Sequence, residues 1–470
     1  MKHSAQAEFE FQAYFKRQVT ADNHGGQQTS DGGSLLLRES LLNSSLIPRL
    51  AECFYDYRKP EAIEHSLESM LTQRIAGLAL GYEDINDHEQ LRKDPAQVLL
   101  ANKKGLGGEE PVTLAGKSTL NRMELSAEGG DGRYKKIIAR SDKIESLLIK
   151  QGVKAIPRRT REIVLDFDAT DDLIHGTQEG RFYNGYYGDY CYLPLYCFHG
   201  DVPLLAKLRK SDGDASEGTV EALAQIVPAI RKRFGKKIRI ILRADSGFAR
   251  ESILSWCERH NVYYCVGLAK NPRLTTELEE IYAKMAGKVE KGELRSPCRR
   301  FKQFHYQTLS SWSRSRRVIG KAELLREKKN SRFIVTNLPV LGFIEDPHGR
   351  FAPRSLYQDF YCARGNMENR IKEQQLELFA DRTSTYSMKS NQLRLWFSAF
   401  AHLLMSLFRK KGLAGTPLTK ATVGTIRLKL FKVSARITIS TRRIHFEFPS
   451  SYPYQAEFAA VLRNLRSGFV

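Results

Sequence analysis

The middle of the chain carries short apolar or alternating runs separated by polar turns, and this pattern predicts β-strands. The predicted strands lie at 163–168, 187–198, 202–208, 237–242 and 262–266. Apolar positions three and four residues apart predict helices at 217–234 and 249–260. The resulting order of three strands, a helix, a strand, a helix and a strand is typical of an α/β domain with a mixed sheet.

Helical spacing dominates the regions on either side. Pro60 opens a predicted helix, and Asp94 followed by Pro95 is a second helix-start signal. Residues 433–448 alternate as in a hairpin. We therefore expect five parts: a mainly helical domain (1–150), the first part of the α/β core (158–270), a β-rich basic insertion (271–352), a last core helix (353–390) and a C-terminal helical and hairpin region (391–470).

The 470-residue chain is strongly basic. Lys and Arg number 74 against 53 Asp and Glu, which gives a net charge of +21. Residues 284–332 hold 15 basic and four acidic residues, and residues 407–443 hold ten basic residues and no acid. Both stretches interleave charges with apolar and aromatic residues, as folded basic surfaces do. Nucleic acid is the expected partner of such a protein.

Several other classes of protein are disfavoured. The longest apolar stretch, 396–408, is too short to span a membrane, and the N-terminus has no apolar signal segment. Seven scattered cysteines fit a reducing compartment, so we expect a cytoplasmic protein. The Gly-Lys-Ser-Thr at 116–119 lacks the upstream glycine of a phosphate-binding loop, so no nucleotide cofactor is expected.

Three acids stand in three predicted contexts. Asp168 ends the first strand, Asp245 follows the fourth strand, and Glu368 lies inside the helix after the insertion. Acids at strand ends of an α/β sheet face the crevice where ligands bind. Three converging carboxylates would suit two Mg²⁺ (or Mn²⁺) ions, which catalyse phosphoryl transfer as a pair. Asp166 lies on the same strand face and is an alternative first acid.

The helix around Glu368 has an unusual polar stripe. Five side chains at spacings of three and four share one face: Tyr361, Arg364, Glu368, Lys372 and Gln375. Such a stripe is a candidate binding face, in which Arg364 would grip a phosphate, or it is a salt-bridged surface. Arg243, close to Asp245, would either contact DNA phosphate or pair with an acid.

The spacing of Tyr361, Arg364 and Glu368 resembles the YREK signature of bacterial DDE transposases encoded by insertion sequences. Gln375 stands where that signature has Lys, and Lys372 lies one turn earlier on the same stripe. Other stretches resemble the insertion-sequence 1380 group of this family, including TSDGGSLLLRES (29–40), GYEDINDHEQLR (81–92), LDFDATDDLIHGTQEG (165–180) and RADSGFAR (243–250).

The resemblance implies a ribonuclease H-like fold with Asp168, Asp245 and Glu368 as catalytic metal ligands. Asp168 is preferred to Asp166 because its Asp-Ala-Thr context is similar to the family's Asp-x-Thr. In relatives an aromatic residue of the insertion can stack on a flipped base, so Trp312 is a candidate DNA contact or a core residue of the insertion.

The implied activity is metal-dependent strand cleavage and strand transfer by a homodimer on DNA. Residues 1–150 would bind the terminal inverted repeats of the element, and target DNA would be the second partner; the protein would then associate with the nucleoid. Two alternatives remain open: a catalytically silent DNA-binding relative of a transposase, and a ribonuclease H-like nuclease acting on other DNA.

Overall fold

The computed structural model describes residues 9–125, 136–326, 328–339 and 349–467, and the remaining parts of the predicted domains lie outside this description. The described chain forms two compact units. One contains residues up to Glu52, Asp56–Met123 and the residues from Leu407 onward, and we call it the helical unit. The other contains Cys53–Tyr55 and Glu124–Ser406, and we call it the sheet unit.

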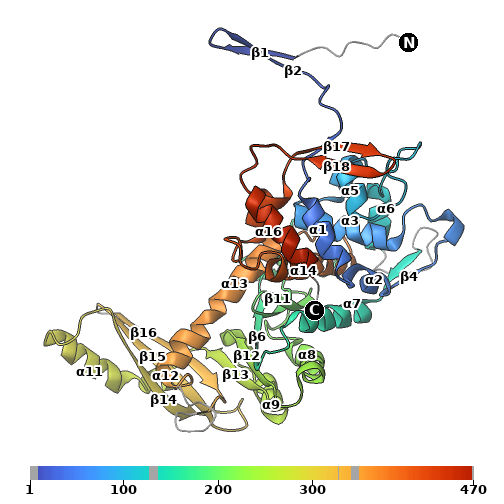
Figure 1. Cartoon of the computed structure of the whole chain (residues 1–470). Helices are drawn as coiled ribbons and strands as arrows, with labels where there is room; N and C mark the ends of the chain where they lie inside the picture. The colour runs from blue at the N-terminus through green and yellow to red at the C-terminus, as the bar shows by residue number, and fades with distance from the viewer. Residues whose placement is uncertain (1–8, 126–135, 327, 340–348, 468–470) are drawn as a thin grey trace. The chain divides into compact units, whose positions relative to one another are not determined.

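An eight-stranded mixed sheet is the centre of the sheet unit (Figure 1). Its strands, in spatial order, are β11 (Val202–Lys207), β10 (Leu195–His199), β6 (Glu162–Ala169), β12 (Arg239–Ala244), β13 (Tyr263–Leu268), β16 (Lys328–Thr336), β15 (Arg316–Leu325) and β14 (Cys298–Tyr306). Strands β6, β12 and β13 run parallel, whereas β10 runs antiparallel to β6 and β11. The strands predicted at 163–168, 202–208, 237–242 and 262–266 are confirmed as β6, β11, β12 and β13.

Buried apolar residues explain why these strands form the core. In β6, Ile163, Leu165 and Phe167 are fully buried, as expected for a central strand covered by helices. The covering helices are α7 (Ser141–Ala155), α8 (Thr219–Phe234) and α9 (Glu251–Arg259) (Figure 1). In α8, Leu223, Ile226 and Ile230 repeat at helical spacing and are all buried.

The basic stretch after the second acid extends the main sheet. Strand β16 pairs antiparallel with β13, and β15 and β14 follow at the sheet edge. Two helices precede these strands, α10 (Pro272–Thr276) and α11 (Glu279–Glu290). This stretch thus contributes three strands to the main sheet, and β16 joins it to the core strand β13 through backbone hydrogen bonds. The finer five-part division of the chain stays a prediction.

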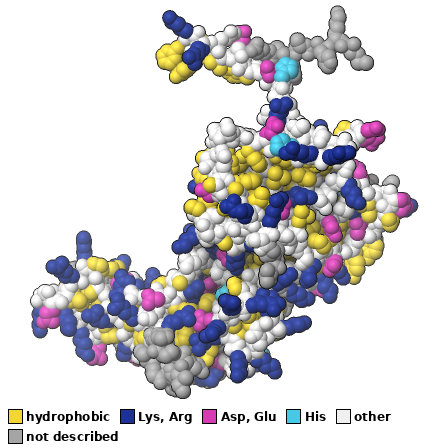
Figure 2. Space-filling model, in the orientation of Figure 1, with side chains coloured by type: hydrophobic (Ala, Val, Ile, Leu, Met, Phe, Trp, Pro, Cys, Tyr) yellow, Lys and Arg dark blue, Asp and Glu magenta, His cyan; other side chains and the backbone are white. Residues whose placement is uncertain are grey.

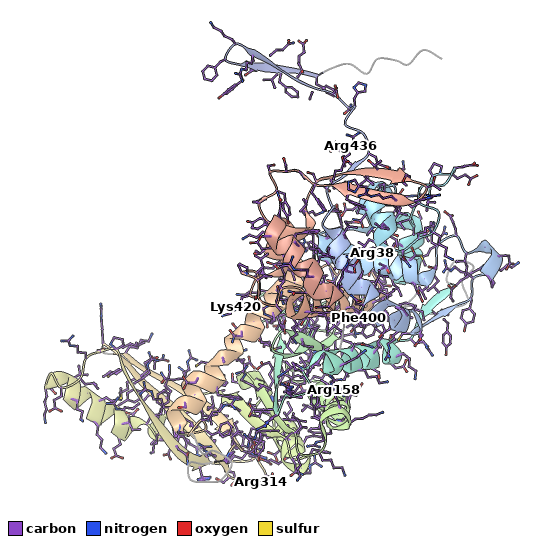
Figure 3. All side chains as sticks on the ribbon, in the orientation of Figure 1. Arg38, Arg158, Arg314, Phe400, Lys420 and Arg436 are labelled. Atoms are coloured by element: carbon purple, nitrogen blue, oxygen red, sulfur yellow. The ribbon has the colours of Figure 1, made fainter. Side chains whose placement is uncertain are left out.

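The predicted polar helix is a run of differently wound turns. It begins with α12 (Pro353–Ser355) and continues as η5 (Leu356–Tyr361), η6 (Cys362–Arg364), α13 (Gly365–Lys372) and η7 (Glu373–Glu377). The segments η5 and η7 are π-helical, a winding that is often found at functional sites. The apolar helix α14 (Met388–Lys411) follows, and its Phe400, labelled in Figure 3, is fully buried.

Two small sheets complete the description of this part. Strands β7 (Asp172–Leu173), β9 (Asp189–Tyr192) and β8 (Phe182–Asn184) form one, and β4 (Phe54–Asp56) with β5 (Ile137–Ala139) forms the other. The single strand predicted at 187–198 is wrong, because the chain breaks around Pro194 and its halves, β9 and β10, join different sheets.

The helical unit combines short helices with two hairpins. Its longer elements are α1 (Ser34–Leu42), α2 (Leu46–Ala51), α3 (Leu67–Leu80), α5 (Pro95–Leu100), α6 (Lys117–Glu124) and α16 (Gln455–Arg466). Single turns are η1 (Pro60–Ala62), η2 (Ile85–Asp87), α4 (His88–Leu91), α15 (Val423–Ile426) and η8 (Arg427–Phe431). Its strands are β1 (Phe9–Tyr14), β2 (Arg17–Ala21), β3 (Gln28–Thr29), β17 (Ala435–Ser440) and β18 (Arg443–Glu447).

The predicted helix starts in this unit are only partly confirmed. Asp94 caps α5, because its Oδ1 accepts a hydrogen bond of 2.8 Å from the Ala96 N–H. Pro60 opens a single turn, whereas the long helix begins at Leu67 after the cap residue Ser66. The hairpin predicted at 433–448 is confirmed by the pairing of β17 with β18. Among the described residues, no helix combines the length and apolar character that crossing a bilayer requires.

A buried carboxylate holds the helical unit together. Asp31 is fully buried and accepts hydrogen bonds of 2.7 Å from Tyr82 Oη, Gln97 Nε2 and Lys432 Nζ. These groups come from four distant stretches of the chain. A buried charge is stable only when it is paired and fully hydrogen-bonded, so this cluster fixes how the stretches meet.

We predict that Gly33→Ala destabilises the helical unit. A Cβ at Gly33 would lie 1.7 Å from the Leu430 carbonyl oxygen, which is backbone and cannot move aside cheaply. The expected loss is about 1–3 kcal/mol, measured by thermal and denaturant unfolding. Gly287→Ala in α11 is the control, because a Cβ there meets nothing within 4 Å. It should instead stabilise by about 0.5–1 kcal/mol, and equal effects of both substitutions would contradict the steric argument.

Candidate active site

Asp168 and Asp245 lie at the carboxyl ends of two neighbouring strands, at the same edge of the sheet. Strands β6 and β12 are parallel neighbours, and Arg243 lies opposite Asp166 in their register. Asp168 and Asp245 each follow two residues later. Because parallel strands present their carboxyl ends at one edge, these two acids emerge side by side. Asp245 is held in its turn by a 2.8 Å hydrogen bond from the Gly247 N–H to its Oδ1.

Arg364 brings the third acid to the same place. Its Nη1 donates a hydrogen bond of 3.0 Å to Asp168 Oδ2, and its Nη2 donates one of 2.7 Å to Glu368 Oε1. The carboxylates of Asp168 and Glu368 are therefore separated by a single guanidinium group. Burial lowers the pKa of Arg364, but Asp168, Glu368 and Asp245 raise it, and the net shift is upward.

The electrostatics of Asp168 show the same convergence. Burial raises the pKa of its carboxyl group to about 6, with Arg364 opposing the shift and the charges of Asp245 and Glu368 adding to it. A carboxyl group with two like charges nearby and a raised pKa is typical of functional sites.

Tyr361 packs against the turn that carries Asp245. A Cβ on Gly267 would lie 2.6 Å from Tyr361 Oη and 2.7 Å from the Ser246 nitrogen, so only glycine leaves room for this approach. The phenol is largely buried, and burial raises its pKa to about 12. The sequence pattern did not identify Gly267, because nothing local marks a position that two distant segments approach.

Asp166 and Arg243 form a buried ion pair. Arg243 Nε and Nη2 donate to Asp166 Oδ1 and Oδ2 at 2.5 and 2.8 Å, and Nη1 donates to the Phe360 carbonyl at 2.5 Å. Asp166 is 4% exposed and Arg243 8% exposed. The geometry therefore favours Asp168 over Asp166 as the first acid, and it favours the acid-pairing alternative over a DNA contact for Arg243.

The remaining members of the polar stripe have separate surroundings. Gln375 Nε2 donates a hydrogen bond of 3.1 Å to the Asp171 carbonyl, which ties η7 to the loop after β6. Lys372 is exposed. Of the predicted five-residue face, Arg364 and Glu368 are in contact and Tyr361 lies against the turn of Asp245. Gln375, in the π-helical segment η7, is bound to the Asp171 backbone instead.

Trp312 is buried in the connection between β14 and β15. It is 5% exposed, its ring meets Tyr306 edge-on at 5.9 Å between centroids, and the Arg316 guanidinium lies over it at 5.2 Å. These contacts favour the packing alternative for Trp312. The base-stacking role assigned to it stays a prediction.

No metal-binding cluster is already assembled in the described ranges. There, no three or more His, Cys, Asp or Glu side chains stand close enough to share an ion. The Arg364 guanidinium takes the place between Asp168 and Glu368.

We predict a pH-dependent penalty on stability from Asp168. Its pKa in the folded protein, about 6, lies above the ordinary value of 3.8, so the folded state binds the proton more tightly. The free energy of unfolding without metal should therefore fall as pH rises from about 4 to 6, by at most about 3 kcal/mol.

Chemical unfolding of wild type and Asp168→Asn in EDTA measures this penalty. The variant should gain stability over wild type across that pH range and match it near pH 4. Asp189→Asn, at an exposed acid, is the control. A difference between wild type and Asp168→Asn that stays constant from pH 4 to 7 would contradict the assignment.

Comparison with known proteins identifies the family. The model of the family "Transposase DDE domain group 1" matches residues 11–468. No curated protein matches the chain, whereas seven chains of solved structures do. One is the cryo-EM structure of the piggyBac transposase synaptic complex with hairpin DNA, with 11% identity, a TM-score of 0.41 and coverage of 86% of this chain and 80% of that chain. Because the family model spans nearly the whole sequence, the chain belongs to the group 1 DDE transposase domain family.

Proposed function

We propose that this chain is an insertion-sequence transposase of the YREK branch, similar to the insertion-sequence 1380 group. It would bind the terminal inverted repeats of its own element and catalyse DNA cleavage and strand transfer. The observation that carries the proposal is the meeting of Asp168, Glu368 and Arg364 beside the Asp245 turn. The strand order β11-β10-β6-β12-β13 supports the assignment of a ribonuclease H-like core.

The donor set fits divalent cations. Asp168, Asp245 and Glu368 offer carboxylate oxygens, the ligands that Mg²⁺ and Mn²⁺ prefer, at a place where the fold already accommodates a positive group. We infer that these three residues would hold two ions. When bound, such a pair supplies activation of a water or 3′-hydroxyl and stabilisation of the leaving oxygen.

The other residues would position the substrate. Arg364 is the only group of the stripe that pairs with two of the acids, and its release would free a planar guanidinium to hold a DNA phosphate through two hydrogen bonds. Tyr361 would set the distance between the helix and the Asp245 turn. Lys372 is exposed on the next turn and is our candidate for the role of the signature lysine.

Basic surfaces support DNA binding. Figure 2 shows Lys and Arg side chains over the part formed by α11 and β14–β16, where exposed basic residues include Lys284, Lys288, Lys291, Arg299, Arg300, Lys328 and Lys329. Not every basic residue is available there, because Arg314 (Figure 3) and Arg316 pair with Glu258 of α9. The basic residues of the 407–443 stretch also differ in their availability to DNA. Lys432 is bound to Asp31, whereas Arg436, Arg442 and Arg443 are exposed.

We infer that these surfaces hold the element ends, that residues 1–150 contribute to their recognition, and that two copies act together on DNA. Affinity that falls steeply between low and moderate salt is expected for such phosphate contacts.

Metal-dependent nicking tests the proposed function. We predict that the protein nicks DNA carrying its element ends in Mg²⁺ or Mn²⁺, and that Asp245→Asn lowers the rate by at least about 10³-fold while end binding persists, because the carboxylate would act on the transition state and not on the duplex. Joined products with a target plasmid distinguish a transposase from a plain nuclease. Wild type that binds ends but never cuts would instead support the catalytically silent alternative, for which the Gln375 departure leaves room.

A second prediction concerns the guanidinium between the acids. Arg364→Gln should bind Mn²⁺ several-fold more tightly than wild type in the absence of DNA, because the cation that competes for Asp168 and Glu368 is removed. Electron paramagnetic resonance of free Mn²⁺ measures this directly. Arg370→Gln is the matched control, since Arg370 pairs with Glu373 on the same helix. Unchanged or weaker Mn²⁺ binding by Arg364→Gln would show that Arg364 does not stand in the ion's place.

A further inference from the structure

The hairpin of β8 and β9 exposes a group of aromatic rings. Four of them are at least two-fifths exposed: Phe182 at 49%, Tyr183 at 53%, Tyr186 at 89% and Tyr190 at 43%. Tyr186 has the highest exposed fraction among the large hydrophobic side chains in the described part of the chain. Contiguous exposed apolar side chains on a protein surface are a feature of interaction sites.

The tip of this hairpin is held in a defined shape. Asn184 Oδ1 accepts hydrogen bonds from the N–H groups of Tyr186 and Tyr187 at 3.0 and 3.4 Å, and the Asn184 carbonyl accepts one of 2.8 Å from the Gly188 N–H. The rings of Tyr186 and Tyr187 meet edge-on at 4.9 Å between centroids. The backbone of the hairpin tip is therefore ordered before a ligand binds. This order lowers the entropic cost of packing a ligand on Tyr186.

The hairpin stands next to the candidate active site. Strand β9 pairs with β7, with Tyr192 opposite Asp172, and β7 begins four residues after Asp168. The hairpin is also anchored by Ser211, whose Oγ donates to the Phe182 carbonyl at 3.0 Å and whose carbonyl accepts from Asn184 Nδ2 at 2.9 Å. Burial, followed by the charge of Asp171 and more weakly that of Asp168, raises the pKa of Tyr187 to about 12.

The chemistry of the hairpin favours a nucleobase as its occupant. Three of its four exposed rings are tyrosines with polar edges. The Arg181 guanidinium lies 4.9 Å over the Tyr190 ring, and the exposed Lys210 is the backbone bridge partner of Tyr192 in β9. Rings and cations together bind single-stranded nucleic acid, because bases stack on the rings while the cations attract the backbone. An aliphatic protein interface would lack this combination.

We propose that Tyr186 is a stacking platform for an unpaired DNA base next to the phosphate that is cleaved. The inference rests on the proposed function, because it places that phosphate at Asp168, Asp245 and Glu368. It gives the base-stacking task to an exposed ring at the tip of the hairpin that follows the strand of Asp168, whereas Trp312 is buried. Tyr186 is a positioning residue in this scheme: it holds the base, and the strand attached to that base is thereby aligned.

The test combines photocrosslinking with cleavage kinetics on the full-length protein. End DNA carries 5-iodouracil at single positions flanking the cleavage site, and irradiated complexes are digested and mapped by mass spectrometry. Wild type should crosslink from one or two such positions to Tyr186. Tyr186→Ala should lose that crosslink and cleave about ten- to a hundredfold more slowly, the range that stacking of one base corresponds to.

Tyr186→Phe is the matched control, because it keeps the ring and should cleave like wild type. Because Tyr186 is exposed, neither substitution removes a side chain from the core, and circular dichroism checks that both variants are folded. No crosslink to Tyr186 together with full activity of Tyr186→Ala overturns the inference and leaves the proposed function intact. A Tyr186 crosslink in a wild-type protein that never cuts keeps the stacking site and overturns the proposed function instead.

Discussion

The buried ion pair between Arg243 and Asp166 is the interaction on which the geometry of the site depends. It joins two neighbouring strands, and its third hydrogen bond reaches the Phe360 carbonyl in the helical run that carries Glu368. Strand β6 supplies Asp168, strand β12 leads to Asp245, and the run from η5 to α13 supplies Glu368. One guanidinium thus connects all three sources of acid. A buried charge without its partner is costly, so this arrangement resists local rearrangement.

Beside this pair, the guanidinium group of Arg364 balances the negative charge of the candidate site. Arg364 neutralises two of the acids in the metal-free protein, and burial still keeps the pKa of Asp168 high. The same side chain is the best candidate for a phosphate grip. In the proposed function, Arg364 would leave the two acids when metal ions bind there and would then hold a DNA phosphate. The spacing of one helical turn between Arg364 and Glu368 allows the two side chains to pair in the absence of metal.

Much of the sheet could be predicted from the sequence, and so could the placement of Asp168 and Asp245 at neighbouring strand ends, because both have local signals. Strands such as β6 and β12 are short apolar runs, and Asp168 and Asp245 are the polar residues that end them. Glu368 is a candidate from its place in the predicted polar helix, and the resemblance implies its role as the third acid. Features that depend on distant partners could not be predicted, including the burial of Arg243, the pairing of β16 with β13 and the split at Pro194. The local sequence pattern also did not show that some residues in the family-like stretches serve packing. Asp31 and Gly33 are examples, because both are packed in the interior of the helical unit.

The π-helical turn of η5, directly ahead of Arg364 and Glu368, limits which changes of length the chain can accept. Each residue added to or removed from a helix rotates everything after it by about 100° relative to what comes before. A wide turn that holds one extra residue sets the rotational phase of the whole carboxylate-bearing segment. An insertion or deletion between Pro353 and Tyr361 would swing Glu368 away from the strands even though every active-site side chain were retained. Relatives that stay active should therefore vary in length on either side of this turn, and not within it.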